Sequence, residues 1–365
     1  MRNGDAMRSG VRILVHMPNW LGDAVMALPA LRYIRESLPR AGLHLAARPG
    51  LFDLLGTQPG VDGVIVSPPS AKPALIRCLV GGRRALPEEW AGIAPALGVL
   101  FPNSLQSAVW LWRLGARRRV GYALDCRRLF LTDPLVRDGR VEMLHFTRYY
   151  LEVAQKAVGI AAAFSDFAPP PILDRSFLLP RLGAPESGVE EARRLYAEGG
   201  GEGGYAVLAP MSAYGPVKDW PKEHYRQLAK ALIDIFGLTP VVTGSAGQRD
   251  GCAAVLAGLP GGVNLAGRTS LPGFVGLIAG SRLFVGGDSG GAHVAAALCV
   301  PTLVIFGVTN PARTKALGPR VRMLGRGEAG APDLSQAGIR ARAEKALRDI
   351  APAEAVAAIG DLLRD

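Results

Sequence analysis

Cysteine is scarce in this chain, and closely spaced cysteines are lacking altogether. The 365 residues include 4 cysteines, none of them in a CxxC pair: Cys78, Cys126, Cys252 and Cys299. Cysteines so few and so widely spaced argue against a disulfide framework and against a cysteine-based zinc site, so neither is expected. The first ten residues, MRNGDAMRSG, lack the apolar segment of a secretory signal. These absences predict a protein of a reducing compartment, the cytoplasm.

An unbroken membrane-spanning segment is lacking as well. Residues 289–312 contain no Asp, Glu, Lys or Arg, and this stretch is long enough for a bilayer span. Five glycines and prolines interrupt it: Gly290, Gly291, Pro301, Gly307 and Pro311. The segment is better explained as a helix, a turn and a buried strand, so a soluble protein is predicted.

Aromatic residues make up only 7% of the chain, whereas positive charge is in excess, with a formal net charge of +11. Most of that excess lies in residues 1–180. A basic half suggests an anionic partner, such as a phosphorylated glycan, nucleic acid or an acidic membrane face. A solvated basic surface explains it equally well. Single-stranded nucleic acid favours aromatics interleaved with basic residues, so the low aromatic content argues against it.

The chain has enough apolar material for two domains, since 49% of its residues are hydrophobic and 20% charged. In its first half, short apolar runs alternate with helical stretches, which is typical of an α/β domain with a parallel sheet. One helix is predicted from Asp23 to Leu38. The predicted strands are Val11–Val15, Leu43–Ala47, Gly63–Val66 and Gly98–Phe101.

The same alternation starts again in the second half, after a linker marked by Pro169, Pro170 and Pro171 and a loop over 180–188. A helix is predicted over Lys222–Phe236, and two Ala-rich helices over Asp333–Asp365. The predicted strands are Tyr205–Ala209, Pro240–Thr243, Leu283–Val285 and Pro301–Phe306. We therefore expect two doubly wound, Rossmann-like domains, 1–175 and 176–365, facing a central cleft in which α/β folds bind ligands.

Two motifs follow predicted strands of the first domain. Asn19-Trp20-Leu21-Gly22-Asp23 places a carboxylate at the tip of a strand–loop–helix unit, although an ordinary helix N-cap explains Asp23 equally well. The second motif contains Asn103 and Ser104 and precedes two arginine clusters, Arg117–Arg119 and Arg127–Arg128. Small polar groups suit a hydroxyl-rich ligand, and arginines suit carboxylates or phosphates.

Two further motifs follow strands of the second domain. The loop from Ser212 to Pro221 carries Gly215 and Lys218, and can present N–H groups and an ammonium to a phosphate. The run from Gly286 to His293, GGDSGGAH, feeds a glycine-rich loop into a helix N-terminus, which is an anion site by geometry. Neither GxGxxG nor GxxxxGK[ST] is present there, so a dinucleotide fingerprint or P-loop is not indicated.

The four motifs together resemble a known family. The order N-W-L-G-D, P-N-S-x-x-S-A, G-P-x-K-x-W-P and D-S-G-x-x-H-V-A-A-A-L is similar to that of the ADP-heptose:lipopolysaccharide heptosyltransferases, and closer to their second branch. The resemblance covers about 11–321. It implies a GT-B fold and inverting transfer of L-glycero-D-manno-heptose from ADP-heptose to the inner core of lipopolysaccharide.

The resemblance also implies roles for particular residues. Asp23 matches the general-base aspartate, and Lys218 the lysine that binds and neutralises the diphosphate. The implied donor-binding residues are Ser212, Lys218, Asp250 for the ribose, Thr269 near adenine, Asp288, Ser289, Gly290, Gly291 and His293. The implied acceptor-binding residues are Asn19, Trp20, Asn103, Ser104, Arg118 and Arg127. At Gly291 this chain departs from the family pattern, which has a bulkier residue.

No D-x-D motif, the usual metal-binding signature of metal-dependent sugar transferases, occurs in the chain. A helix N-terminus with Lys218 can neutralise a departing diphosphate instead, so no metal or cofactor is expected. The expected partners are the ADP-heptose donor, the lipopolysaccharide acceptor and the acidic inner face of the membrane. The alternatives are a transferase for another nucleotide sugar, a nucleotide-sugar epimerase and a non-catalytic glycan-binding protein.

Overall fold

The structure of the chain is a computed structural model that describes residues 11–67, 95–162, 176–213, 215–307, 309–325 and 337–364. The predicted linker at Pro169–Pro171 and Cys78 lie outside these residues. The chain divides into two compact units, Met1–Leu178 and Leu179–Asp365, called unit 1 and unit 2 below. None of the described helices is long and apolar enough to cross a bilayer.

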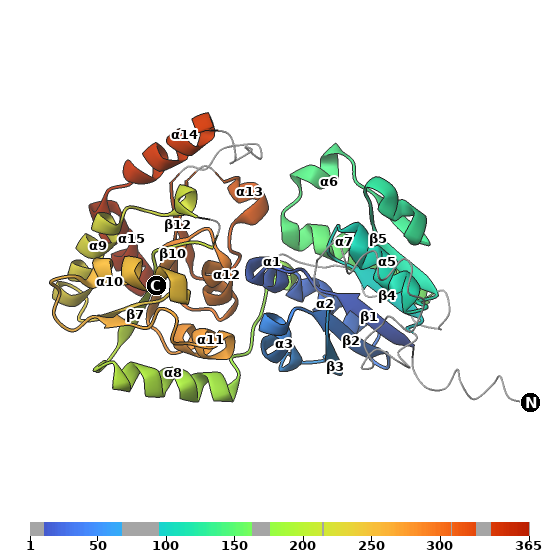
Figure 1. The fold of residues 1–365 in the computed structure, drawn as a ribbon, viewed down its shortest axis with the longest axis horizontal. Helices are drawn as coiled ribbons and strands as arrows, with labels where there is room; N and C mark the ends of the chain where they lie inside the picture. Colours follow the sequence, from blue (N-terminus) through green and yellow to red (C-terminus); the bar gives the residue numbers. More distant parts are fainter. Residues whose placement is uncertain are drawn as a thin grey trace, which may run out of the picture. The chain divides into compact units, whose positions relative to one another are not determined.

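Unit 1 contains a six-stranded parallel sheet in the order β3-β2-β1-β4-β5-β6. Its strands β1 to β5 are labelled in Figure 1. Chain connections run outward from β1 in one direction and from β4 in the other, so helices cover both faces of the sheet. Its strands are β1 (Arg12–His16), β2 (Gly42–Ala47), β3 (Gly63–Val66), β4 (Leu97–Leu100), β5 (Arg118–Ala123) and β6 (Asp133–Val136). Its helices are α1 (Leu21–Met26), α2 (Leu28–Ser37), α3 (Pro49–Gly56), α5 (Leu105–Arg113), the 3-10 helix η4 (Asp125–Phe130), α6 (Gly139–Met143), α7 (Phe146–Ala162) and the 3-10 turn η5 (Ser176–Leu178).

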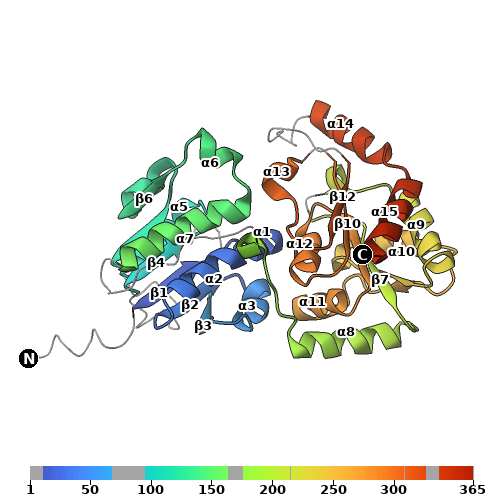
Figure 2. The same cartoon turned by 180° about the vertical axis from the view of Figure 1, so that it is seen from behind.

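Unit 2 contains a second six-stranded parallel sheet with the equivalent order, β12-β11-β10-β7-β8-β9. Figure 2 shows this unit with β7, β10 and β12 labelled. Its strands are β7 (Tyr205–Ala209), β8 (Thr239–Val242), β9 (Val263–Asn264), β10 (Leu283–Gly287), β11 (Thr302–Ile305) and β12 (Val321–Leu324). Its helices are α8 (Glu186–Glu198), η6 (Pro216–Lys218), α9 (Lys222–Asp234), η7 (Ala246–Gln248), α10 (Arg249–Leu256), α11 (Leu271–Ala279), α12 (Gly290–Ala297), α13 (Pro311–Thr314), α14 (Ala337–Arg348) and α15 (Pro352–Arg364). The predicted α/β class with two Rossmann-like sheets is confirmed.

The predicted helix from Asp23 to Leu38 is wrong as a single element. It is divided at Ala27, which is both the C-cap of α1 and the N-cap of α2. Pro29 in the first turn of α2 has no N–H, so it cannot donate to the carbonyl of Val25 and continue α1. The predicted loop over 180–188 is also too long, because α8 already begins at Glu186.

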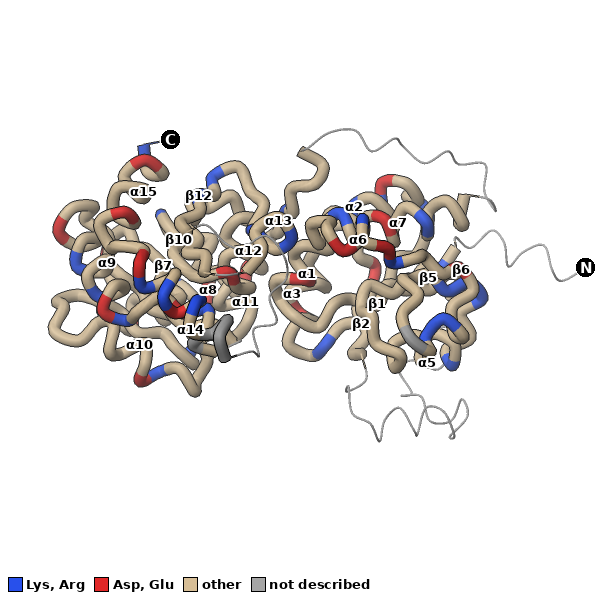
Figure 3. Tube along the Cα trace, turned by 90° about the horizontal axis from the view of Figure 1, so that it is seen from above, with Lys and Arg blue, Asp and Glu red and all other residues tan. Residues whose placement is uncertain are grey.

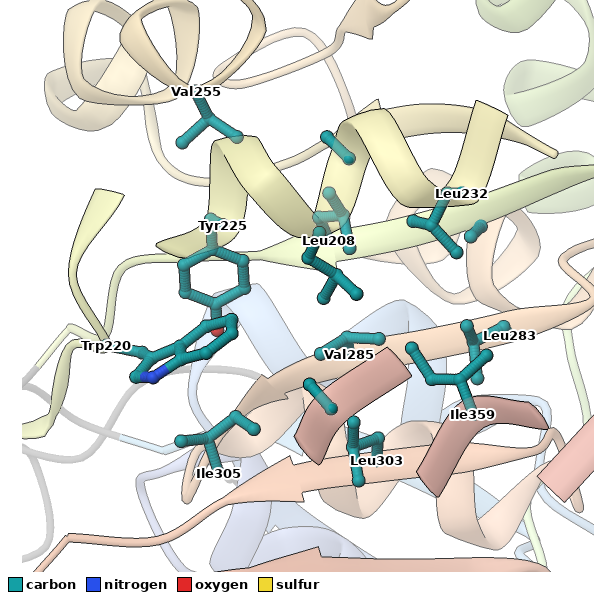
Figure 4. Close-up of a cluster of buried hydrophobic side chains, with 14 of the residues drawn as sticks. Leu208, Trp220, Tyr225, Leu232, Val255, Leu283, Val285, Leu303, Ile305 and Ile359 are labelled. Atoms are coloured by element: carbon teal, nitrogen blue, oxygen red, sulfur yellow. The ribbon is translucent and has the colours of Figure 1, made fainter. Parts of the chain in front are cut away.

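Each sheet is buried between its helices, as the near-continuous apolar strands predict. In unit 2 the core joins β7, β10 and β11 to α9 and the C-terminal α15, with Leu208, Val285, Leu303 and Ile359 at its centre (Figure 4). Trp220 lies at one end of this core and donates its indole N–H to the carbonyl of Ile350 at 3.0 Å. The tryptophan therefore fixes the loop between β7 and α9.

Candidate active site

The order of the strands defines one ligand-binding position in each unit. In unit 1 the connections diverge between β1 and β4, and in unit 2 between β7 and β10. Doubly wound sheets bind ligands at this switch point, beyond the carboxyl ends of the two strands. The four motifs predicted from the sequence follow β1, β4, β7 and β10, so each motif lies beside a switch point.

Asp23 lies in the first turn of α1, directly after the loop that follows β1. The N-cap position belongs to Trp20, so the alternative that makes Asp23 an N-cap is wrong. Its carboxylate accepts a hydrogen bond from Tyr150 on α7, with 3.1 Å between the hydroxyl oxygen and Oδ1. Burial, and then the nearby Asp23 carboxylate, raise the pKa of Tyr150 well above its ordinary value. The tyrosine therefore stays protonated and remains the donor.

The neighbouring residue on α7 holds the motif after β4 in the same manner. The side-chain amide of Asn103 donates to the hydroxyl of Tyr149 at 2.7 Å. Tyr149 stacks on Tyr122 of β5, with ring centroids 4.3 Å apart. Tyr122 in turn donates to Glu152 at 2.8 Å. One helix therefore supplies contacts to the loops after both central strands of the sheet.

Arg127 is not part of a solvated face, since only 1% of it is exposed. It donates to the carbonyl of Pro102 at 2.9 Å and to Oδ1 of Asn103 at 3.1 Å. Burial lowers its pKa to about 10. Among the described residues its Nε and Nη2 atoms have no hydrogen-bond partner. Arg127 therefore supports the loop after β4 through its hydrogen bonds to Pro102 and Asn103.

His16 at the end of β1 is buried near this arginine. Burial and the charge of Arg127 lower the pKa of His16 to about 4, so the imidazole is neutral at physiological pH. A Cβ at Gly121 of β5 would lie 2.9 Å from Nη2 of Arg127 and 3.0 Å from Cβ of Leu100, so the glycine leaves room for the guanidinium. The carboxyl-terminal halves of β1 and β5 thus pack beside the buried guanidinium of Arg127.

The remaining predicted acceptor residues fall in two places. Asn19, half-buried, and Trp20, 62% exposed, lie in the loop after β1. Ser104 is the N-cap of α5, and its hydroxyl accepts from the backbone of Ser107 at 3.2 Å. Arg118 is the first residue of β5 and therefore lies at the amino end of the parallel strands, opposite the switch point. It pairs with Asp133, with 2.7 Å between Nε and Oδ2. The structure does not bring Arg118 together with the others.

Lys218 and Asp288 meet at the switch point of unit 2. The Lys218 ammonium lies 3.2 Å from Oδ2 of Asp288 and 3.4 Å from the backbone carbonyl of the same residue. Thr314 on α13 donates to the same Oδ2 at 3.1 Å. Asp288 is buried, whereas Lys218 is partly exposed. The buried Asp288 carboxylate thus accepts from two donors and fixes the position of the Lys218 ammonium.

The short helix η6 that carries Lys218 is held on both sides. Val217 is buried against Ala343 of α14, and Trp220 is anchored in the core of unit 2. The backbone N–H of Ser212 donates to Asp219 at 2.7 Å and its hydroxyl to the carbonyl of Gly215 at 3.2 Å. Gly215 has φ +106°, a conformation that favours glycine. The loop is pre-formed around its lysine.

The glycine-rich motif opens α12 as predicted, with Ser289 at the N-cap and Gly290 as the first helical residue. Helix N-termini leave N–H groups without intrahelical acceptors and carry a partial positive charge. A Cβ at Gly291 would lie 2.9 Å from the ring of Phe284 and 3.2 Å from that of Phe274. Two phenylalanines therefore occupy the room that a side chain at Gly291 would need. His293 is buried one turn further along.

The two remaining donor candidates follow the outer strands of the same sheet. Asp250 is exposed in the first turn of α10, after β8. Thr269 is half-buried after β9, next to Ser270, the N-cap of α11. All nine predicted donor residues therefore lie beyond the carboxyl ends of the strands of unit 2. Within the described residues, no group of three or more His, Cys, Asp or Glu side chains is placed so that it could share a metal ion.

Sequence reasoning missed Tyr149, Tyr150 and Thr314. The two tyrosines lie within an amphipathic helix, where aromatic residues ordinarily pack into the core, and most of their surface does so. Thr314 lies in a single turn of helix that begins at Pro311. Only their hydroxyl contacts distinguish them, and such contacts join residues far apart in the sequence.

The sequence of this chain is similar to those of known glycosyltransferases. The sequence profile described as glycosyltransferase family 9 (heptosyltransferase) matches residues 96–341. The lipopolysaccharide heptosyltransferase 2 of Escherichia coli is 31% identical over 323 residues, 86% of this chain and 88% of that protein. The lipooligosaccharide heptosyltransferase 2 of Haemophilus ducreyi is 26% identical, over 97% of this chain and 99% of that one.

Solved structures of glycosyltransferases are similar to this chain in fold. The ADP-heptose lipopolysaccharide heptosyltransferase II of E. coli superposes with a TM-score of 0.77 at 28% identity, covering 97% of this chain and 99% of that chain. A family 9 glycosyltransferase of Veillonella parvula gives a TM-score of 0.81 at 17% identity, covering 97% of both chains, which is a likeness of fold. The predicted GT-B class is confirmed.

Proposed function

The chain belongs to glycosyltransferase family 9, the heptosyltransferases, and we propose that it transfers L-glycero-D-manno-heptose from ADP-heptose to the inner core of lipopolysaccharide. That it is a glycosyltransferase follows from its family. The donor and acceptor are proposed from its similarity to lipopolysaccharide heptosyltransferases 2. The observation that carries the proposal is the presence of polar and charged groups at the switch points of both sheets.

We assign the donor to unit 2. Lys218 and the N-terminus of α12, with Ser289, Gly290 and Gly291, bind the diphosphate. The Lys218–Asp288 contact of 3.2 Å holds the ammonium before the donor arrives, so binding requires little reorganisation. Further along the sheet, Asp250 binds the ribose and the backbone at Thr269 contacts adenine. Ser212 and His293 complete the donor-binding set.

Departure of ADP leaves negative charge on the diphosphate. Under this assignment, Lys218 and the positive end of the α12 dipole stabilise that charge without a metal ion. The absence of a D-x-D motif from the sequence agrees with this assignment. We therefore propose a metal-independent transfer in which Lys218 acts as the electrostatic catalyst.

We assign the acceptor to unit 1, where Asp23 is the general base. Inversion at the anomeric carbon requires that the acceptor hydroxyl lose its proton as its oxygen forms the new bond and ADP leaves from the opposite face. Asp23 takes this proton, and the hydrogen bond from Tyr150 fixes the orientation of the Asp23 carboxylate. Positioned general bases contribute about 10²–10⁴-fold to rate.

We assign acceptor binding to Asn19 and Trp20 in the loop after β1 and to Asn103 and Ser104 in the loop after β4. Arg127 acts through Asn103 and Pro102, since its guanidinium is buried and donates to both. It is therefore a positioning residue. The lipid-linked acceptor places the reaction at the acidic inner face of the membrane, consistent with a cytoplasmic protein in peripheral contact with it.

Release of ADP tests the proposal and separates it from the alternatives. The purified protein is incubated with ADP-heptose, and ADP is measured with and without a heptose-deficient core acceptor. Transfer requires acceptor-dependent ADP release. An epimerase would alter the donor without acceptor, and a transferase for another nucleotide sugar would respond only to that donor in a matched panel. Binding without turnover of any donor would overturn the proposal.

A further inference from the structure

Unit 1 carries an exposed apolar surface among arginines, made of residues to which the proposed function assigns no role. It consists of Trp112, Arg113 and Arg117 at the end of α5, and of Arg128, Leu129 and Phe130 in η4, and is called the η4 patch below. Leu129 is 81% exposed and Trp112 is 42% exposed. Exposed large apolar residues in a cluster mark interaction surfaces more often than isolated ones do.

The two halves of the η4 patch are joined by direct contacts. The rings of Trp112 and Phe130 lie 5.5 Å apart in an edge-to-face arrangement. Arg119 connects η4 with the segment after α5, because it donates to the carbonyls of Phe130 and Ala116 at 2.6 Å each. The patch is therefore a fixed surface, with Leu129 projecting from it.

Among the described residues, the charged side chains of the η4 patch are all arginines. Arg118 and Arg119 of the predicted cluster are bound to protein oxygens, and Arg127 is buried, so none of the three is available to a partner. Arg117 and Arg128 are exposed, and no carboxylate of the described residues pairs with either. Arg113 adds a third guanidinium, 4.8 Å above the Trp112 ring. Figure 3 shows basic residues gathered around α5, β5 and β6.

We propose that the η4 patch docks unit 1 on an anionic lipid bilayer, with Leu129 and Trp112 entering the interface and the surrounding arginines contacting the headgroups. The inference rests on the proposed function in that it gives the enzyme access to a lipid-linked acceptor. A bilayer supplies diffuse negative charge over an apolar layer and requires no shape match to a small patch. Tryptophan and arginine are suited to that boundary.

A second copy of the chain is a poorer occupant of this surface. Symmetric pairing would bring the arginines of one patch against those of the other, and such like-charge contacts are unfavourable. Charge complementarity therefore favours an acidic surface of a different kind.

Vesicle co-sedimentation tests the proposal with the full chain and without donor or acceptor. We expect binding to vesicles of phosphatidylglycerol and phosphatidylcholine, and much weaker binding to phosphatidylcholine alone. Arg117→Gln and Arg128→Gln should each reduce the partition coefficient about fivefold at low salt, given ~1 kcal/mol per basic residue. Leu129→Ser should reduce it by about tenfold, the effect of withdrawing one leucine side chain from an apolar layer.

Matched controls come from unit 2. Ile235, 65% exposed at the end of α9, gives the control Ile235→Ser, and the exposed Arg193 on α8 gives Arg193→Gln. Both should bind vesicles as the wild type does. Melting temperatures should be unchanged for Leu129→Ser, because that side chain is exposed, so a loss of binding cannot be attributed to unfolding.

Several results would overturn the docking proposal: equal binding to neutral and anionic vesicles, binding that Leu129→Ser leaves intact, or a dimer that Leu129→Ser converts to monomer in sedimentation velocity. The last result would assign the patch to a second copy. Transfer to a delipidated core oligosaccharide separates this outcome from failure of the proposed function. The docking variants should retain that transfer, whereas a protein that binds vesicles but transfers nothing contradicts only the function.

Discussion

The hydroxyl of Tyr150 donates to the carboxylate of Asp23 across 3.1 Å, joining residues that lie 127 positions apart in the chain. Asp23 follows the first strand of unit 1, and Tyr150 lies in the helix that packs across the same sheet. A donated hydrogen bond stabilises the charged form of a carboxylate and fixes its direction. The contact therefore connects the packing of α7 with the activity of the proposed base.

Replacement of Tyr150 by phenylalanine should change the pH dependence of transfer. Without the donated hydrogen bond the Asp23 carboxylate accepts a proton more readily, so the acidic limb of the kcat/KM profile should move to higher pH by about one unit. Donor affinity should stay at the wild-type value. Steady-state kinetics between pH 5 and pH 8 measure this shift.

Tyr149→Phe is the matched control for that experiment. It removes a hydroxyl of the same helix, but one bonded to Asn103 rather than to Asp23. We expect an increase in acceptor KM and an acidic limb at the wild-type position. A Tyr150→Phe profile that coincides with that of the wild type would show that the contact has no influence on the base.

Lys218→Ala should weaken ADP and ADP-heptose alike, by about 1.5–3 kcal/mol if one charge-assisted hydrogen bond to the diphosphate is lost. Adenosine has no phosphate and should bind the variant and the wild type equally. Isothermal titration calorimetry with ADP, ADP-heptose and adenosine separates the contribution of the diphosphate to the binding free energy from that of the nucleoside. A parallel loss of adenosine affinity would mean that η6 contacts the nucleoside instead.

His16 should make the folded protein sensitive to acid. Its pKa is lowered to about 4 in the folded state, whereas an unfolded histidine has a pKa of about 6.5. Between these values the unfolded chain binds a proton that the folded chain does not, so stability is full above pH 6.5 and falls as the pH approaches 4. The expected loss is on the order of 3 kcal/mol.

Urea unfolding at several pH values measures that loss. His16→Gln cannot bind the proton, so its stability should fall less steeply than that of the wild type over the same interval. Identical slopes for the two proteins would contradict the assignment of a buried neutral imidazole beside Arg127.

Treatment with EDTA should leave transfer intact, because Lys218 and the N-terminus of α12 are assigned the role of a metal ion. The measurement is the rate of acceptor-dependent ADP release before and after dialysis against the chelator. Loss of activity that Mg²⁺ or Mn²⁺ restores would refute the metal-independent mechanism.

The sequence predicted the positions of the strands that surround both switch points because those strands are continuous apolar runs, such as β1 and β10. It did not predict β5, which begins with Arg118 and Arg119, because charged residues at a strand start conceal the apolar pattern. Nor did it predict the burial of Arg127. A guanidinium buried against backbone carbonyls depends on the packing of other segments, which local periodicity does not contain.

The site was predictable to a similar extent. Residues such as Asp288 and Gly290 belong to loops whose composition indicates anion binding, and the topology places them at a strand end. The partners of these residues were not predictable. Thr314 and Tyr150 reach the site through tertiary contacts, and only their single hydroxyl groups show the connection.

The most direct test of the account is heptose transfer by the Asp23→Asn variant. Asparagine keeps the shape of aspartate and an oxygen for the Tyr150 hydroxyl, but it cannot take a proton from the acceptor. With ADP-heptose and a heptose-deficient core acceptor, the wild type should yield a core extended by one heptose, detected by mass spectrometry. The variant should bind the donor normally and turn over about 10²-fold more slowly or worse. Near-normal turnover by Asp23→Asn, or a wild type that does not extend the core, would contradict the account.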